Sequence, residues 1–197
     1  MKVQFKLTEN QPIIKPNQDL KWESRGTISP SVIFDGKKWR MIYRAIGSDK
    51  AIRLGYAESL DGINWEKLEE PLTIPDRSIL ENCGVDDPII TKITDKYLIS
   101  FTNYIQKKKH VKTKIKVLST NDFDKFISVT PAFANHWRKS YPGDVIYPEK
   151  INGAFYPIHT VNPSVQFGFS NFLRRWSDSA VMLSTAANEW ESAKISV

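Results

Sequence analysis

The sequence predicts an all-β fold built as a β-propeller or a similar array, and three observations support this. One unit occurs three times, at residues 29–45, 87–102 and 143–159. Pro88 follows Pro30 by 58 positions, and Asp144 follows Pro88 by 56. Each unit also has the pattern of two short strands joined by a tight turn. A repeat of this length, made of strands, is typical of propeller blades, whose innermost strands surround a central axis.

The first unit shows the strand–turn–strand pattern most clearly. Residues 32–34 are a short apolar run, and Asp35-Gly36 is a strong hairpin signal because glycine tolerates positive φ. Residues 38–43 then alternate with the period of two that strands require. The matching turns of the later units are Thr94-Asp95 and Asn152-Gly153.

A third strand is expected in each unit, at residues 52–59, 113–119 and 164–170. Each ends on serine and is followed by a turn and then a large aromatic residue, namely Trp65, Phe126 and Trp176. These aromatics suit a packing role between adjacent blades better than a ligand role.

After the third unit, residues 181–184 and 190–195 resemble the start of a fourth blade. Three blades and a fragment do not close a ring of four to eight, and an open ring exposes strand edges. We therefore expect one domain, 1–197, that is an incomplete propeller at its C-terminal end. It would be a truncated product, a piece of a longer protein, or an assembly that closes between subunits, and the open edge favours a homo-oligomer.

Composition narrows the class of protein. The chain is 41% hydrophobic and 12% aromatic, which indicates a globular domain with many rings to pack between sheets. The single cysteine, Cys83, excludes an internal disulfide framework and fits a reducing compartment. No apolar stretch resembles a signal peptide or a membrane span, so a cytoplasmic protein without a membrane partner is expected.

The net charge of +6 comes largely from residues 107–116, where six lysines and His110 gather. A solvated hairpin tip explains this run better than a phosphate-contacting arm, because no aromatics are interleaved and no nucleic-acid motif is present. We therefore expect no nucleic-acid partner. The three histidines lack metal-ligand spacing and no phosphate-binding glycine loop occurs, so neither a metal nor a cofactor is expected.

The first candidate catalytic residues are in Asp86-Asp87-Pro88, at the start of the inner strand of the second unit. Adjacent like charges raise one carboxyl pKa and make a candidate general acid, whereas the alternative is an ordinary Asp-Pro turn. The repeat favours the functional interpretation, because Asp144 takes the related place in the third unit.

Other polar side chains should reach the same region. Arg44 ends a strand of the first unit, His159 is its counterpart in the third, and Asn103 lies close to that place in the second. An acid pair with a further Asp, Arg, Asn and His around one axis is typical of a site that binds or cleaves sugars. Nearby tyrosines either stack on sugar rings or belong to the core; they are Tyr43, Tyr104, Tyr147 and Tyr156.

At these residues the sequence resembles glycoside hydrolase family 130, which contains β-mannoside phosphorylases and hydrolases on a five-bladed β-propeller. The resemblance covers nearly the whole chain in order, but the last blade is absent. It is carried by "QPIIKP" at 11–16, "SPSV…YRA" at 29–45, "SLDG" at 59–62, "GVDDP" at 84–88, "DVIYPEKING" at 144–153, His159, and "WESAKI" at 190–195.

The resemblance implies roles for particular residues. Asp87 matches the catalytic acid, which protonates the glycosidic oxygen through a substrate hydroxyl while phosphate or water attacks with inversion. The positions that match sugar or phosphate ligands are Arg44, Asp61, Asp144 and His159. With Asp86 and Asn103 from the residue pattern, these form the predicted substrate-binding set.

At three positions where the family has a basic residue, this chain has Ile89, Gly143 and Thr160. Ser29 stands where the family has an asparagine. Because phosphate recognition needs cations or aimed N–H donors, these losses favour hydrolysis of β-mannosides. The alternatives are a phosphorylase that uses inorganic phosphate and a non-catalytic sugar-binding or inactive propeller. The expected partner in each case is an oligosaccharide.

Overall fold

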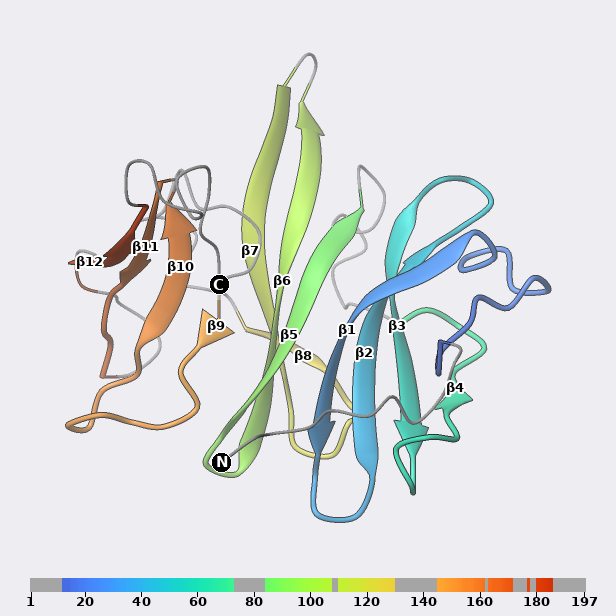
Figure 1. Ribbon diagram of the computed structural model, residues 1–197, viewed down its shortest axis with the longest axis horizontal. Coiled ribbons are helices and arrows are strands. Elements are labelled where there is room, and N and C mark those ends of the chain that lie inside the picture. The colour runs from blue at the N-terminus through green and yellow to red at the C-terminus, as the bar shows by residue number, and fades with distance from the viewer. Residues whose placement is uncertain are drawn as a thin grey trace, which may run out of the picture.

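The computed structural model contains three antiparallel four-stranded sheets that lie side by side (Figure 1). It describes residues 12–72, 84–107, 110–129, 145–161, 163–171, 177 and 180–185. Within these ranges the chain has strands and turns but no helix, hence no helix that could cross a membrane. The all-β prediction and the incomplete propeller are confirmed, since each sheet corresponds to one blade.

Each sheet is a meander in which the strands follow one another in chain order. Sheet 1 consists of β1 (Gly26–Phe34), β2 (Trp39–Ile46), β3 (Ile52–Ser59) and β4 (Glu66–Lys67). Sheet 2 consists of β5 (Val85–Ile93), β6 (Lys96–Lys107), β7 (His110–Thr120) and β8 (Ile127–Val129). Sheet 3 consists of β9 (Val145–Ile146), β10 (Pro157–Val161), β11 (Ser164–Phe167) and β12 (Ala180–Ser184).

The first strands of sheets 1 and 2 contain the same irregularity. The register of β1 against β2 shifts between Ile28 and Ser31, and that of β5 against β6 shifts between Asp86 and Ile89. Ser29 and Asp87, each followed by proline, adopt left-handed backbone angles with φ of 49° and 46°. Proline cannot donate to the ladder and is tolerated at bulges, so the repeated Pro marks a repeated bulge.

A hydrophobic layer joins sheets 1 and 2. Ile42 and Leu54 from sheet 1 pack with Ile99 and Phe101 from sheet 2. Because side chains alternate along a strand, even-numbered residues of β2 and odd-numbered residues of β6 face this layer. A second, smaller cluster lies between sheets 2 and 3.

The aromatic residues after the third strands have different places. Phe126 packs against the layer between sheets 1 and 2, as predicted for a residue between blades. Trp65 instead packs on the other face of sheet 1, against a cluster that includes Met41 and Tyr43. Trp176 lies outside the described residues.

The lysine-rich run lies at the end of the β6–β7 ladder where the two strands connect, and Lys107 pairs with His110 there (Figure 1). This register supports the predicted hairpin, although residues 108 and 109 lie outside the described ranges, as does Cys83. Within those ranges, no three His, Cys, Asp or Glu side chains gather closely enough to hold a metal ion.

Candidate active site

Strand register brings several of the predicted residues to one end of sheets 1 and 2. Arg44 lies opposite Ile28 near the end of β2. In sheet 2, Asp86 lies opposite Thr102, and Val85 lies opposite Asn103. The second strand of one blade and the first strand of the next therefore supply the cation and the acid pair.

An ion pair connects these strands. The Nη1 atom of Arg44 lies 2.8 Å from both Oδ1 and Oδ2 of Asp86. The two side chains are 22% and 14% exposed, so water screens the pair only in part. Hydrogen bonds between two charged groups are among the stronger ones in proteins, and this pair joins two blades at the predicted site.

Asp87 follows in an unusual backbone conformation. Its φ of 46° lies in the left-handed region, which residues other than glycine seldom occupy. Its N–H donates to Oδ1 of Asp86 at 2.9 Å. Ser29 adopts the same conformation at the matching bulge of sheet 1, so the conformation belongs to the bulge; in sheet 2 it places an acidic side chain next to Asp86.

Tyr104 is the tyrosine that the structure places beside the acid pair. Burial raises the pKa of its hydroxyl, and the negative charges of Asp86 and Asp87 raise it further, while Arg44 lowers it. Tyr43, in contrast, belongs to the core, since it is buried and donates its hydroxyl to Glu23 at 2.8 Å. Only Tyr104 of these two is placed to meet a substrate.

Three polar atoms at this end are buried and have no hydrogen-bond partner among the described residues: Arg44 Nε, Thr102 Oγ1 and Asn103 Oδ1. Arg44 and Asn103 lie on strand faces that point into the same layer between sheets 1 and 2. Buried polar atoms are nearly always hydrogen-bonded in folded proteins. A donor and an acceptor left over here could be satisfied by the hydroxyl groups of a ligand.

Thr102 is a buried polar residue outside the predicted set, and it lies on the opposite face of β6 from Asn103, toward sheet 3. The bulges align Ser29 with Asp87, and the register then makes Thr102 the counterpart of Arg44, with Asn103 one position further. The equal spacing from Pro30 to Arg44 and from Pro88 to Thr102 would have identified it.

His159 lies in β10, the second strand of sheet 3, which corresponds to β2 and β6. Its side chain is fully buried, and burial lowers its pKa to about 4. The imidazole is therefore neutral near pH 7. Its role as a substrate ligand stays a prediction, and Asp144 lies outside the described residues.

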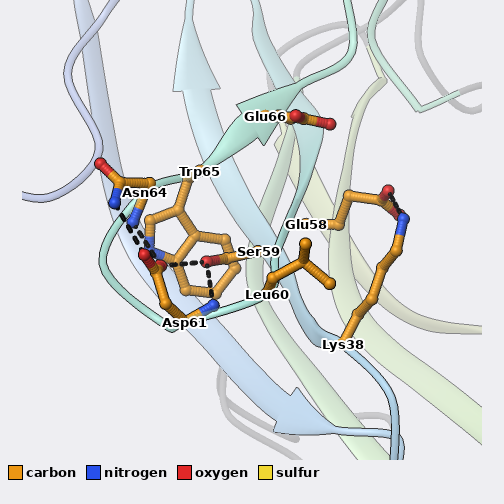
Figure 2. Close-up of a pocket in the computed structure, with 8 residues that line it drawn as sticks. All are labelled: Lys38, Glu58, Ser59, Leu60, Asp61, Asn64, Trp65 and Glu66. Carbon is orange, nitrogen blue, oxygen red and sulfur yellow. Dashed lines mark hydrogen bonds and ion pairs between the residues drawn. The ribbon is translucent and has the colours of Figure 1, made fainter.

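Asp61 is the predicted site residue that the structure does not bring to this group. It follows Ser59, which lies opposite Trp39 at the far end of sheet 1 from Arg44. Its carboxylate accepts hydrogen bonds from the Ser59 hydroxyl, from the N–H groups of Ile63 and Asn64, and from the Asn64 side chain, at 2.7–2.9 Å (Figure 2). These bonds lower its pKa and give the carboxylate a role in the turn.

A pocket of about 420 Å³ also lies at this far end, lined by residues that include Lys38, Glu58 and Trp65 (Figure 2). Lys38 and Glu58, which both line it, form an ion pair, and Trp65 Nε1 donates to the Gly62 carbonyl. The pocket is separate from the acid pair, and most of its polar side chains bond to one another.

Comparison with known proteins gives a consistent result. The chain is 27% identical to a 1,2-β-oligomannan phosphorylase of Thermoanaerobacter sp. (strain X514), over 99% of this chain and 66% of that protein. It is equally similar to a β-1,2-mannobiose phosphorylase of the same organism, over 98% of this chain and 67% of that one. The chain therefore spans about two thirds of the length of these relatives.

Solved structures share the fold. One is from a study of mannoside phosphorylases and of hydrolases that target β-1,2 mannosidic linkages in Candida mannan. It gives a TM-score of 0.76 at 20% identity, over 91% of this chain and 61% of that one. The β-1,2-mannobiose phosphorylase from Listeria innocua gives 0.69 at 18% identity, over 94% and 68%. Finally, the family model described as β-1,4-mannooligosaccharide phosphorylase matches residues 5–197, so this chain belongs to glycoside hydrolase family 130.

Proposed function

We propose that this chain forms the acid-bearing part of an enzyme that cleaves β-mannosides with inorganic phosphate, and that Asp87 is its general acid. The observation that carries the proposal is the junction at which Arg44 of sheet 1 holds Asp86 beside the strained Asp87. The family model and both curated relatives support phosphorolysis, which the sequence analysis ranked below hydrolysis.

In the proposed reaction, the proton of the Asp87 carboxyl passes to the glycosidic oxygen by way of a substrate hydroxyl. The bond between that oxygen and the anomeric carbon breaks while a phosphate oxygen attacks the carbon from the opposite face. Inversion of a β-mannoside gives α-mannose 1-phosphate and a shortened sugar. General acid catalysis of this kind contributes on the order of 10²–10⁴ in rate.

Arg44 and Asn103 have groups that suit sugar binding. Arg44 Nε is a donor and Asn103 Oδ1 is an acceptor, and both are buried without a partner among the described residues. A sugar hydroxyl both donates and accepts, so one or two hydroxyls can satisfy both atoms. Tyr104 would offer its ring edge or its hydroxyl beside them.

Hydrolysis is the second candidate, and a specific observation favours it. Ile89 is half-buried and Thr160 fully buried at positions where the family resemblance implies basic residues. Neither side chain can neutralise a phosphate. If the enzyme is a hydrolase, water is the attacking group and the products are free sugars.

Product analysis on β-1,2- and β-1,4-linked mannobiose, with and without phosphate, tests the proposal. Sugar 1-phosphate that forms only with phosphate supports it, whereas free mannose at a phosphate-independent rate establishes hydrolysis. Asp87→Asn should lower turnover about 10³-fold without changing the thermal midpoint, because the amide cannot give the proton. Asp122→Asn, in an exposed turn of sheet 2, is the matched control and should keep full turnover.

Unchanged turnover in Asp87→Asn would remove Asp87 from the mechanism. Saccharide binding without any turnover in the unaltered protein would leave the binding-module alternative instead.

A further inference from the structure

We propose that Asp86 is a positioning residue for Asp87 rather than a ligand of the sugar, and that Arg44 fixes it across the junction of sheets 1 and 2. This inference rests on the proposed function, because it explains how that acid is held. It also changes the role of Asp86, which the sequence analysis placed among the substrate-binding residues.

Both oxygens of Asp86 already accept hydrogen bonds. Oδ1 accepts from Arg44 Nη1 at 2.8 Å and from the Asp87 N–H at 2.9 Å, and Oδ2 accepts from the same Nη1 at 2.8 Å. The side chain is only 14% exposed. Oδ1 has no acceptor site left, and Oδ2 has one on a side chain that is mostly buried, which makes Asp86 a poor ligand for a sugar hydroxyl.

One guanidinium nitrogen of Arg44 makes the whole ion pair. Arg44 uses Nη1 for both Asp86 oxygens, and its buried Nε has no partner among the described residues. Arg44 can therefore hold Asp86 and still donate elsewhere. The pair fixes the carboxylate relative to sheet 1, and the carboxylate fixes the amide of Asp87.

Sheet 1 contains the same bulge without a carboxylate. Ser29 has φ of 49° against 46° for Asp87, yet the residue before it is Ile28. The left-handed conformation therefore forms without an acidic neighbour, and Asp86 is not needed to make the bulge. What Asp86 adds is a fixed hydrogen-bond partner for the Asp87 amide, at the one bulge that carries an acid.

The kinetic experiment compares Asp86→Ala, which removes the acceptor, with Asp86→Asn, which keeps an oxygen for the Asp87 N–H. We expect kcat to fall about 10²-fold in Asp86→Ala and clearly less in Asp86→Asn, since a displaced acid costs about that factor. The KM for the mannoside should stay within about threefold in both. A sugar ligand would give the opposite split, with KM raised and kcat little changed, and that result would overturn the proposal.

Arg44→Gln combined with Asp86→Ala supplies a second test. If Arg44 acts on Asp87 through Asp86, the effects of the two changes on kcat overlap, and the double variant is hardly slower than the worse single variant. Multiplication of the two effects would show that Asp86 and Arg44 act separately and would contradict the proposed clamp.

Amide exchange of Asp87 in the substrate-free protein gives a test that needs no turnover. Loss of the acceptor in Asp86→Ala should speed exchange of the Asp87 N–H about five- to tenfold, as expected for one lost hydrogen bond, while Asp86→Asn changes it less. The amide of Ser29, at the matched bulge, should be unaffected. Equal exchange of Asp87 in the unaltered protein and in Asp86→Ala would overturn the inference.

These outcomes separate the two proposals. If Asp87→Asn keeps turnover, the proposed function fails, whatever Asp86 does. If Asp87→Asn abolishes turnover while Asp86→Ala keeps its kcat, the proposed function stands and the positioning role fails.

Discussion

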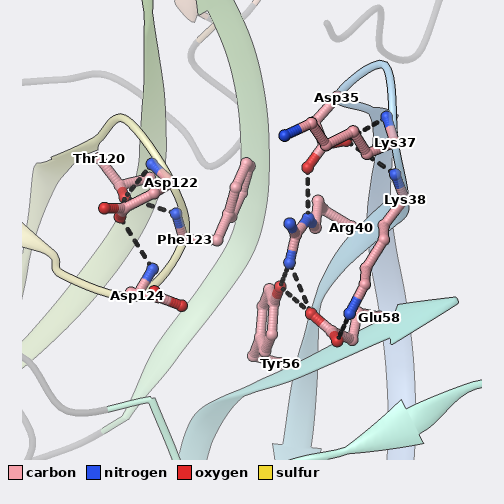
Figure 3. Close-up of polar contacts among 10 residues, drawn as sticks. All are labelled: Asp35, Lys37, Lys38, Arg40, Tyr56, Glu58, Thr120, Asp122, Phe123 and Asp124. Carbon is pink, nitrogen blue, oxygen red and sulfur yellow. Dashed lines mark hydrogen bonds and ion pairs between the residues drawn. The ribbon is translucent and has the colours of Figure 1, made fainter.

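Arg40 and Arg44 lie four positions apart on the same face of β2, and their surroundings differ in a way that separates structural from functional charge. Arg40 donates from Nε to Asp35 at 2.6 Å and from Nη1 to the Tyr56 hydroxyl at 2.7 Å, and it also pairs with Glu58 (Figure 3). Its guanidinium carbon lies 5.4 Å from the centre of the Phe123 ring of sheet 2. Arg44 has one bonded carboxylate and a buried Nε without a partner among the described residues.

The difference lies in what is left unsatisfied, not in how much charge is present. The Arg40 end has more charged side chains and the described pocket, yet the charges of Arg40, Asp35 and Glu58 are paired with one another. The Arg44 end has spare buried donors and acceptors beside a strained acid. Spare hydrogen-bonding capacity in a buried place must be filled by something, and a substrate is one way to fill it.

Exchanging each arginine for methionine would test this comparison most strongly. Arg44→Met should lower turnover about 10²-fold, because the ion pair to Asp86 and the spare Nε donor are both lost. Arg40→Met should lower the free energy of unfolding by about 3 kcal/mol, because Asp35 and Glu58 lose a partly buried partner. Urea unfolding and initial rates, measured on the folded fraction, check both values.

The two arginines would not differ in role if both variants lost turnover and unfolding free energy to the same extent. A large loss of turnover in folded Arg40→Met, or full turnover in Arg44→Met, would show that unsatisfied atoms do not mark the active end.

His159 extends the test to sheet 3. Its folded-state pKa is about 4 and its ordinary value is 6.5, so between these values the unfolded chain binds a proton that the folded chain does not. The free energy of unfolding should therefore fall as the pH decreases from about 6.5 to about 4, by up to about 3 kcal/mol from this residue. His159→Gln should remove that part of the pH dependence, as measured by urea midpoints at pH 7, 5 and 4.

An unchanged pH dependence in His159→Gln would mean that the imidazole is not held neutral by burial. It would then be available as a cation, which would strengthen the case for a phosphate ligand in sheet 3.

The fold was predictable from sequence because its repeat is local. Asp35-Gly36 and Asn152-Gly153 specify turns, and the alternation after them specifies strands, without information from distant residues. The bulge at Ser29 and Asp87 was not predicted, although each of its two copies precedes a proline of the repeat.

The site was less predictable, because it depends on how one blade meets the next. The pairing of Arg44 with Asp86 spans 42 residues and follows from sheet packing. At Asp61 the sequence suggested a role that the structure does not support. Its match to a family motif suggested a substrate ligand, whereas its carboxylate accepts hydrogen bonds within a turn. Sequence shows which polar residues are present, but only the three-dimensional arrangement shows which already have partners.

The smallest change in stability is expected from substitutions in the two turns that follow β3 and β7, the third strands of sheets 1 and 2. In sheet 1, Ser59 and Asp61 make five hydrogen bonds within the turn that Thr120 and Asp122 repeat in sheet 2 (Figures 2 and 3). Backbone N–H groups lower the pKa of both carboxyls. Asp61→Ala and Asp122→Ala should each lower the thermal midpoint slightly at pH 7, with turnover unchanged.

A carboxyl group whose pKa is lower in the folded state stabilises the protein at pH values above its ordinary pKa, which is near 4. This stabilisation is lost as the pH falls below that value. The deficit of both variants relative to the unaltered protein should therefore shrink between pH 4 and pH 2.5, in scanning calorimetry. Asp61 has an additional bond from the Asn64 side chain, so Asp61→Ala should have the slightly larger deficit. A loss of turnover in Asp61→Ala, with none in Asp122→Ala, would return Asp61 to the substrate-binding set and show that the far end of sheet 1 also serves the reaction.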